Sequence, residues 1–418
     1  SLQAQSAAIP HLFHDANVTA CRHCHAPLAL KMVDLGSSPP SNAFNDRPEV
    51  LEKNYPLRVM VCEECWLAQT DIGLFKLDHD ELFTDEYPYF SSTSASWVQH
   101  SRDFVERITK QLDLGPDSLT VEVGCNDGYL LQWVKTPRYG VEPTNTRKKA
   151  LEKGIEVFPQ FFGKKWAENA ALLRGKADLM IANNVLAHVP DINDFVAGFR
   201  ALLKPDGMAV FEFPHLLSLV RNGQFDTIYH EHYSYLSLTS SLAIFADADL
   251  EVFGVEKLET HGGSLRLYVG HRGHHHVSDR VGAILREEQA AGVNTAAFYQ
   301  GFQDVADRVK DALLRFLLDA KDRGAKVAGF GAAAKGNTLL NYAGVRADLL
   351  PYVVDDTPAK QGKFLPGSGI PVRADFDGVP DYIFVLPWNF REEIRGRLAS
   401  LCARGARLVF AIPRLEVV

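Results

Sequence analysis

The densest group of chemically active side chains lies in one short segment, TIYHEHYSYLS, at residues 227–237. Tyr229, His230, Glu231 and His232 are adjacent there, so hydroxyl, imidazole and carboxylate groups share a few positions. The H-x-H spacing differs from the HExxH helix that binds catalytic zinc. A hydrogen-bonded turn that caps a sheet would also accommodate such residues. Because acid–base chemistry needs titratable groups held close together, we interpret the segment as catalytic.

A second informative stretch is LTVEVGCNDGYLL, which begins at Leu119. Apolar and polar residues alternate up to Val123, as in a strand, and a turn of small residues follows. Leu130, Leu131 and Val134 then recur at helical spacing. Such a strand-to-helix turn lets a ligand approach backbone N–H groups closely. The next strand candidate ends in Glu142, where a carboxylate can bind two ribose hydroxyls, so we predict a bound nucleoside.

The glycines of this turn are spaced G-x-x-x-G, whereas dinucleotide-binding turns read G-x-G-x-x-G. The stretch resembles the first motif of S-adenosylmethionine (SAM)-dependent methyltransferases. That resemblance implies that the turn holds the methionine end of SAM and that Glu142 holds its ribose. The turn residues concerned are Gly124, Asn126, Asp127 and Gly128. A structural α/β turn without a ligand is the alternative.

These segments need a sheet to position them, and residues 94–270 predict one, because strand candidates alternate with helices. The candidates are 120–124, 139–142, 155–158, 178–182, 207–213, 251–257 and 264–269. The last two have no helix between them, so we expect an antiparallel pair. Asn183, Asn184 and His188 follow the fourth candidate, at the edge of a parallel sheet where ligands bind.

The N-terminal segment carries two CxxC pairs, Cys21 with Cys24 and Cys62 with Cys65. In a reducing compartment this pattern predicts a tetrahedral zinc site. Four thiolates leave no position open for water, so we interpret the zinc as structural. Two disulfides or four free thiols are the alternatives.

Tyr87 and Tyr89 belong to an aromatic stretch, LFTDEYPYFSST, that Pro88 prevents from forming a simple amphipathic helix. It is either a plug between domains or a lid over a ligand pocket, with the tyrosine hydroxyls as polar tips.

Residues 326–418 begin a second α/β pattern, in which the strand KVAGFG precedes AAAKGNT at the start of a helix. Gly329, Gly331 and the downstream Asp355 suggest a dehydrogenase fingerprint, but Lys335 at a helix N-terminus suits a phosphate group better. We expect a small Rossmann-like lobe that binds an anionic group. A purely structural lobe is the alternative.

The chain has 418 residues, 46% hydrophobic and 23% charged, with a net charge of −8, as in an ordinary globular protein of two or three domains. The acidic balance argues against nucleic acid as the main partner. We expect no membrane association, because no apolar run could span a bilayer. Reduced cysteines and an N-terminal SLQAQSAAIP without a signal-peptide core favour the cytoplasm.

Taken together, the chain resembles the three-domain sugar C-methyltransferases of deoxysugar pathways. The four-cysteine module, EVGCNDG, YHEHYSY and GFGAAAKGN occur in the order typical of that family. The resemblance implies SAM and structural zinc as cofactors, and methylation of a carbon beside the keto group of a nucleotide-linked sugar, commonly a dTDP-4-keto-6-deoxy sugar. It also implies a class I methyltransferase fold, which is Rossmann-like, in the centre of the chain.

The same resemblance implies roles for individual residues. His232 would be the base, and Tyr229, Glu231 and His230 would assist it in roles that stay interchangeable. Asn184 and His188 would lie near the sugar, and Tyr87 and Tyr89 would form the lid. Asn183 would contact SAM, and Lys335 and Asn337 would help the C-terminal lobe to hold the nucleotide sugar.

We therefore expect a zinc-binding domain at 1–75, a methyltransferase domain at 76–270, a helical connector at 271–325 and a nucleotide-sugar-binding lobe at 326–418. Two other interpretations stay open, an NAD-linked nucleotide-sugar oxidoreductase and a non-catalytic nucleotide-sugar-binding protein. The sugar, the methylated carbon, the nucleotide and the oligomeric state stay open as well, and a monomer is compatible with the sequence.

Overall fold

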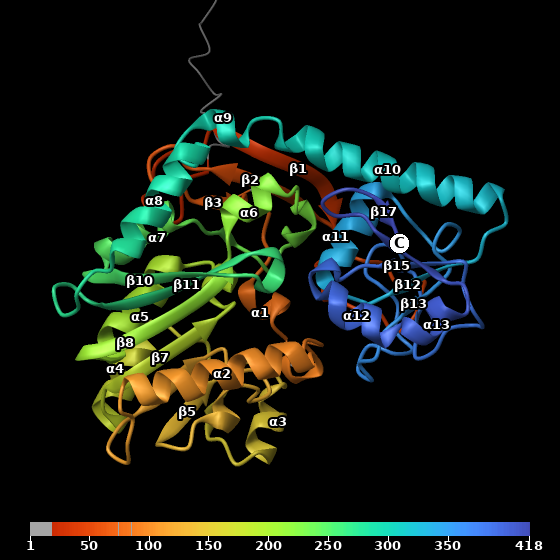
Figure 1. Cartoon of the computed structure of the whole chain (residues 1–418). Coiled ribbons are helices and arrows are strands. Elements are labelled where there is room, and N and C mark those ends of the chain that lie inside the picture. The colour runs from red at the N-terminus through yellow and green to blue at the C-terminus, as the bar shows by residue number, and fades with distance from the viewer. Residues whose placement is uncertain (1–18, 74, 85) are drawn as a thin grey trace, which may run out of the picture.

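The computed structural model describes residues 19–73, 75–84 and 86–418, and its strands form three sheets (Figure 1). The expectation about SLQAQSAAIP lies outside these residues. The helices are α1 (His79–Leu82), α2 (Ala95–Gln111), α3 (Arg147–Glu152), α4 (Lys164–Arg174), α5 (Ile192–Leu202), α6 (Leu216–Arg221), α7 (Leu238–Asp247), α8 (Asp279–Ala291), α9 (Ala296–Tyr299), α10 (Phe302–Asp322), α11 (Ala334–Ala343), α12 (Arg391–Arg397) and α13 (Ala399–Ala403).

The central sheet has the strand order β10-β11-β8-β7-β4-β5-β6. Its strands are β4 (Thr120–Val123), β5 (Arg138–Val141), β6 (Val157–Phe158), β7 (Ala177–Asn183), β8 (Leu203–Pro214), β10 (Leu250–Leu258) and β11 (Ser264–His271). The first five in chain order are parallel, and β11 runs antiparallel to both β8 and β10, as expected for the last pair. This is the class I methyltransferase arrangement.

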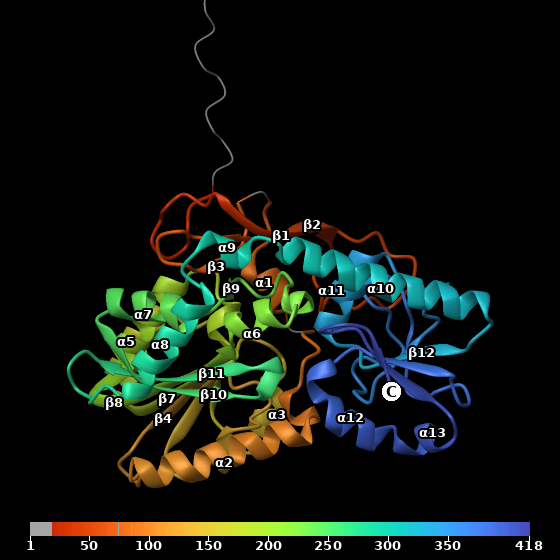
Figure 2. The same ribbon diagram turned by 45° about the horizontal axis from the view of Figure 1, so that its top comes forward.

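Side chains on the two faces of this sheet alternate along β7. Met180 and Ala182 join a core with α4, α5 and α7, whereas Leu179 and Ile181 join a separate core with α2 and α3. Helices therefore cover both faces of the sheet, as a parallel sheet requires. Figure 2 shows α2 beneath the sheet and α5 and α7 on its other side.

The prediction of a helix directly after the glycine turn is wrong. Leu131–Trp133 form only a short 3-10 turn. Leu130, Leu131 and Val134 are all buried, so their spacing reflects packing rather than a long helix. Pro137 follows soon after and restricts Thr136 to extended conformations, which stops a helix from continuing.

The N-terminal sheet has the order β1-β2-β3-β9 and is antiparallel. Its strands are β1 (Leu30–Ser38), β2 (Tyr55–Val61), β3 (Ala68–Thr70) and β9 (Ser234–Tyr235). The last strand comes from the YHEHYSY segment, more than 160 residues later in the chain, where Ala68 pairs with Tyr235 and Gln69 with Ser234. The CxxC segment and the predicted catalytic segment thus belong to one sheet.

The C-terminal sheet has the order β14-β13-β12-β15-β16-β17. Its strands are β12 (Val327–Phe330), β13 (Val353–Val354), β14 (Val372–Arg373), β15 (Tyr382–Val385), β16 (Arg407–Phe410) and β17 (Glu416–Val417). All pairs are parallel except β16 with β17. The lobe is therefore Rossmann-like, as expected.

Helices α8, α9 and α10 join the central sheet to this lobe, and α10 crosses above it (Figure 1). One continuous apolar core contains Val59 of the N-terminal sheet, Leu313 of α10 and Val353 of the C-terminal lobe. The outer parts of the chain are thus packed together. None of the helices in the described ranges is long and apolar enough to cross a bilayer.

Candidate active site

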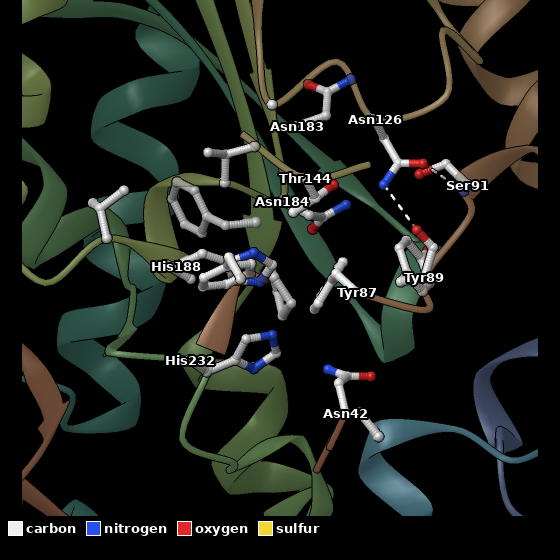
Figure 3. A pocket seen from close by; sticks show the side chains of 18 of the residues that line it. Asn42, Tyr87, Tyr89, Ser91, Asn126, Thr144, Asn183, Asn184, His188 and His232 are labelled. Carbon is white, nitrogen blue, oxygen red and sulfur yellow. Dashed lines mark hydrogen bonds between the residues drawn. The ribbon is translucent and has the colours of Figure 1, made fainter. Parts of the chain in front are cut away.

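A cavity of about 430 Å³ opens at the carboxyl edge of the central sheet and reaches the C-terminal lobe (Figure 3). The predicted site residues that line it are Tyr87, Tyr89, Gly124, Asn126, Glu142, Asn183, Asn184, His188, Tyr229, His232 and Lys335. The predicted residues Asp127, Gly128, His230, Glu231 and Asn337 are described but do not line it. Segments from the whole chain therefore meet at one cavity.

The glycine turn after β4 is held in shape by Asn126, which has a φ of 51°. Its side-chain amide donates to the carbonyl of Tyr89 at 3.0 Å and accepts from the Ser91 N–H at 3.0 Å (Figure 3). A Cβ at Gly124, where φ is 71°, would meet the Val185 side chain at 2.4 Å. The turn is thus closely packed and joined to the segment that carries the predicted lid.

Glu142 follows β5 and lies beside this turn, with both carboxylate oxygens in use. One oxygen accepts the Asn126 N–H at 3.0 Å, and the other accepts the Thr144 N–H and hydroxyl at 3.1 Å each. Burial raises its pKa. The oxygen that accepts only the Asn126 N–H has a lone pair left, so Glu142 fits a ligand with a hydroxyl donor such as a ribose.

Asn183 is the last residue of β7 and Asn184 follows it, and each has a buried side-chain oxygen without a hydrogen-bond partner among the described residues. Buried polar atoms normally have partners, so these two acceptors fit a ligand that brings donors. Asn184 also has a φ of 56°, and its amide nitrogen donates to His261 Nε2 at 3.2 Å. The polar edge predicted after the fourth strand therefore offers unpartnered acceptors beside the cavity.

His232 is buried, and its Nδ1 lies 2.7 Å from the carbonyl oxygen of Thr227. A carbonyl can only accept, so Nδ1 carries the proton and Nε2 has a free lone pair. Burial, together with the nearby positive charge of Lys335, lowers the pKa of His232 to about 3. The ring is therefore neutral near pH 7, as a proton acceptor must be.

Aromatic and imidazole rings surround His232. The His188 ring stacks on it at 4.7 Å between centroids, and Tyr229 lies at 3.9 Å. Figure 3 shows His188 above His232, with Tyr87 facing them. Burial raises the pKa of both Tyr87 and Tyr229 well above the ordinary value, so both hydroxyls stay protonated and can donate.

His230 and Glu231 do not line this cavity, although the Glu231 carboxylate acts electrostatically on the lining residues Tyr87 and Tyr229. His230 Nε2 lies 3.1 Å from the Tyr55 carbonyl, and Glu231 accepts the Asn42 N–H at 2.9 Å. The backbone forms a turn here, in which the His232 N–H donates to the Tyr229 carbonyl at 2.9 Å, so the residues at the two ends of the turn line the cavity and the two between them do not. His230 and Glu231 attach the segment to the N-terminal part of the chain.

Three other predicted residues hold neighbouring segments together. Asp127 accepts the Ser92 N–H at 3.0 Å, and a Cβ at Gly128 would meet the Ile155 side chain at 2.7 Å. Asn337 donates to the Ser41 carbonyl at 2.7 Å, which joins α11 to the N-terminal part of the chain. These contacts account for their positions outside the cavity.

Lys335 enters the cavity from the start of α11. Its ammonium donates to the Asn389 side chain at 2.9 Å and lies 4.5 Å above the Trp388 ring. Burial lowers its pKa, which the charge of the buried Asp226 opposes. Asp226 accepts the Trp388 indole N–H at 2.8 Å, and burial raises its pKa to about 6. An anionic ligand would place a second negative charge near the Lys335 ammonium, in addition to that of Asp226.

Sequence reasoning missed several lining residues, most of which lie in connections between the helices and strands, apart from His79 in α1 and Trp97 in α2. They are Asn42, His79, Trp97, Thr144, Thr227, His261, Asn389 and Phe390, among others. Most belong to segments without a motif. His261 is different, because it precedes Gly262 and Gly263 between the last two strands of the central sheet, and a histidine beside two glycines is a signal that could have been used.

The four predicted zinc ligands come together. Cys21, Cys24, Cys62 and Cys65 are free thiols, and their sulfur atoms all lie within 4.8 Å of one another. The sulfurs of Cys21 and Cys65 are 3.6 Å apart, and those of Cys24 and Cys62 are 3.4 Å apart. Ligands at about 2.3 Å from a tetrahedral zinc would be about 3.8 Å apart, so this set fits zinc.

The CxxC segment also contacts the segment around His232. Arg22, between two of the cysteines, donates to the carbonyls of Thr70 and Tyr233. The Tyr233 N–H in turn donates to the Ala187 carbonyl at 2.7 Å, next to His188. Two hydrogen bonds therefore connect the metal-binding segment to Ala187, the residue before His188 of the stacked imidazole pair.

Comparison with known proteins gives three family matches along the chain. The "Putative zinc binding domain" family matches residues 21–82, the "Methyltransferase domain" family matches 97–254, and the "C-methyltransferase C-terminal domain" family matches 259–413. The three matches follow one another along the chain. The third includes β11 of the central sheet as well as the C-terminal lobe.

Among characterised proteins, the chain is 34% identical over 411 residues to the C-methyltransferase NovU of Streptomyces niveus, covering 96% of this chain and 97% of that protein. It is 33% identical over 112 residues, 25% of this chain and 43% of that protein, to a ubiquinone biosynthesis O-methyltransferase of Salmonella paratyphi A. Magnesium protoporphyrin IX methyltransferase of Synechocystis, solved with SAM, aligns at a TM-score of 0.34 and 16% identity, over 47% of this chain and 98% of that one.

Proposed function

The chain belongs to the C-methyltransferase family, and we propose that it transfers the methyl group of SAM to a carbon beside the keto group of a nucleotide-linked sugar. We further propose that the sugar is a dTDP-linked 4-keto-deoxy sugar and that His232 is the base. The similarity to NovU over nearly the whole chain supports the reaction class. The geometry of the cavity supports the finer assignment.

The observation that carries the assignment is the protonation of His232. Because the Thr227 carbonyl holds the proton on Nδ1, the lone pair of Nε2 is free, and the residue lines the cavity. The same cavity extends from Glu142 to Lys335, so a nucleoside at one end and an anion at the other can bind beside one base. Carbon methylation needs this combination of two ligands and a base.

When bound, SAM supplies an electrophilic methyl group on a cationic sulfur. His232 Nε2 removes the proton from the carbon beside the keto group, and the electrons of that C–H bond form an enolate with the charge on oxygen. As the C=O bond re-forms, this carbon takes the methyl group, and the electron pair of the sulfur–methyl bond stays on sulfur. His232 then releases its proton to water.

The residues around His232 assist this step in distinct ways. The protonated hydroxyls of Tyr229 and Tyr87 can donate to an oxygen that becomes negative, which is where such donors lower a barrier most. The aromatic lining from the Tyr87 segment keeps water away from the enolate. His230 and Glu231 hold the backbone immediately before the base.

Lys335 connects substrate binding to the strength of the base. Its positive charge lowers the pKa of His232. A diphosphate bound at Lys335 would neutralise that charge and so raise the pKa of the base when substrate is present. This supports an anionic nucleotide-linked substrate over a neutral sugar.

Several residues would hold SAM at the other end of the cavity. We assign its ribose to Glu142, and its methionine end to the turn that contains Gly124 and Asn126, with Asn183 beside it. The cysteine site takes zinc as a structural ion, since four thiolates leave no position for water. We also propose that residues 1–75, 76–270 and 326–418 act as zinc-binding, catalytic and nucleotide-sugar-binding parts, with 271–325 as connector.

Incubation with SAM labelled in its methyl group and a panel of dTDP-linked 4-keto-deoxy sugars, followed by mass spectrometry, tests the proposal. We expect a product heavier by one labelled CH2, with the label on carbon. Label on oxygen would contradict C-methylation. Tight SAM binding without any product would contradict the sugar assignment. Turnover of NAD without SAM binding would contradict both the sugar assignment and methyl transfer from SAM.

A further inference from the structure

His261 lines the cavity and has an unusual backbone conformation, yet the proposed mechanism gives it no role. It lies in the turn Thr260–Gly262 between β10 and β11, lines the cavity as a half-buried side chain, and adopts φ 53° and ψ 29°. A residue with a Cβ pays an energetic cost in this left-handed region. Such strain persists where the surrounding structure imposes it, and it is concentrated at functional sites.

The surroundings impose this conformation from two sides. A Cβ at Gly262 would meet the Trp388 ring at 2.4 Å, and a Cβ at Gly263 would meet the Ser218 hydroxyl at 2.5 Å. The turn is therefore wedged between the C-terminal lobe and α6. His261 itself lies 5.1 Å from the Trp97 ring and 6.3 Å from the Phe390 ring, between centroids.

The hydrogen bond to Asn184 determines which nitrogen of His261 carries the proton. The amide nitrogen of Asn184 can only donate, so the Nε2 that it contacts at 3.2 Å is an acceptor. The proton of the neutral ring is then on Nδ1, for which the described residues provide no hydrogen-bond partner. Burial lowers the pKa of His261 to about 3, so the ring is neutral at pH 7.

The position of His261 indicates which ligand its N–H would meet. Lys335 is close enough that its charge lowers the pKa of His261, and Asn389 and Phe390 line the same side of the cavity. A nucleotide sugar held by Lys335 would therefore bring its sugar toward His261, beside the unpartnered oxygen of Asn184.

We propose that His261 is a catalytic residue whose Nδ1–H donates a hydrogen bond to the keto oxygen of the sugar, with Asn184 as the residue that orients its ring. This rests on the proposed function. As His232 removes the carbon-bound proton, negative charge develops on that oxygen, and the neutral imidazole stabilises it without transferring its own proton. The keto oxygen has two lone pairs, so it accepts from His261 and from a tyrosine hydroxyl together.

Two variants separate this role from a structural one. His261→Asn removes the imidazole but tolerates φ near 53°, and His261→Gly removes both the side chain and the strain. We expect kcat to fall at least tenfold in both, KM for SAM to stay within twofold, and the unfolding temperature of His261→Gly to stay level or rise. Asp113→Asn and Asp113→Gly are matched controls, because Asp113 is exposed and has a φ of 50°.

A second measurement isolates the enolate step. With S-adenosylhomocysteine in place of SAM, the wild-type enzyme should exchange the carbon-bound hydrogen of a dTDP-4-keto sugar with deuterated water, and both His261 variants should lose this exchange in parallel with kcat. A kcat within twofold of wild type would overturn the inference. So would normal exchange with a raised KM for SAM, which would make His261 a cofactor contact. Absence of exchange and methyl transfer in the wild-type enzyme would instead contradict the proposed function.

Discussion

His232 donates its Nδ1 proton to the carbonyl of Thr227 across 2.7 Å, inside a segment that two other parts of the chain hold in place. On one side, Thr338 of α11 donates to the Ile228 carbonyl at 2.7 Å. On the other, Arg22 donates to the Tyr233 carbonyl. The zinc-binding segment and the C-terminal lobe thus fix the two ends of the segment that carries the base.

The first prediction concerns Arg22. Arg22→Ala should lower kcat by about tenfold or more, because losing a buried hydrogen bond from a charged group costs about 1.5–3 kcal/mol and frees the backbone next to His232. Steady-state kinetics, zinc content and SAM affinity would be measured together. We expect the last two to stay unchanged, and Arg22→Lys to recover part of the loss.

The exposed Arg47 provides the control, since Arg47→Ala should behave as wild type. Equal losses of zinc and of activity in Arg22→Ala would mean that Arg22 supports only the metal site. Unchanged kcat would mean that the contact with Tyr233 does not position the base.

The second prediction concerns the metal. Removing zinc with a chelator should unfold the segment that carries the four cysteines, because four zinc–sulfur bonds would join the two CxxC turns. β3 pairs with β9 directly after His232, so methyl transfer should stop while SAM still binds to the central sheet. Hydrogen exchange read by mass spectrometry, with released zinc measured by a dye, would test this. A folded, active, metal-free protein would disprove the zinc assignment.

The third prediction concerns Lys335. Lys335→Ala should raise KM for the nucleotide sugar about 10- to 100-fold, as expected for a lost charge-assisted hydrogen bond, with KM for SAM unchanged. Lys321→Ala is the matched control, because Lys321 is exposed and far along α10. Steady-state kinetics of both variants, with each substrate varied in turn, measures the two KM values. Equal effects of Lys335→Ala on both KM values would exclude a specific role in nucleotide-sugar binding.

The fourth prediction concerns pH and stability. The pKa of His232 is lowered to about 3 in the folded protein from about 6.5 when unfolded, so the unfolded chain binds a proton that the folded chain does not. This contribution to stability is present above pH 6.5 and is lost as the pH falls. Between pH 7.5 and pH 6 the free energy of unfolding should fall by about 0.8 kcal/mol for this reason.

Urea unfolding at both pH values, in wild type and in His232→Asn, measures that contribution directly. Buried carboxyl groups with a raised pKa, such as Asp226, act in the opposite direction but are common to both proteins, so they cancel in the comparison. The wild type should lose more stability than the variant by about 0.8 kcal/mol. Equal losses would mean that His232 is not held neutral in the folded protein.

The sequence was informative where local patterns have one physical cause. Alternation and turn residues located the strands of the central sheet, and CxxC spacing located the four cysteines, because a metal site needs ligands on tight turns. The region after Gly128 shows the limit of periodicity. Leu130, Leu131 and Val134 repeat at helical spacing, yet they fill a core from a 3-10 turn.

The parts of the site that sequence could not provide depend on contacts between distant segments. Adjacent residues of YHEHYSY looked equivalent, but a turn closed by the His232 N–H on the Tyr229 carbonyl leaves Tyr229 and His232 at the cavity and Glu231 at Asn42. The segment after this turn pairs as β9 with β3, a contact between residues more than 160 positions apart in the chain. The position of His261 likewise follows from packing against Trp388, which lies over 120 residues later in the chain.

Comparison of His232→Asn with wild type tests the central claim most directly. The two proteins would be assayed with methyl-labelled SAM and a dTDP-4-keto-deoxy sugar, with SAM affinity measured by calorimetry and His276→Asn, at an exposed histidine, as the control. The account predicts loss of at least a thousandfold in methyl transfer, unchanged SAM affinity and a fully active control. Near-normal methyl transfer in His232→Asn would contradict it, because the proton would then leave through another base.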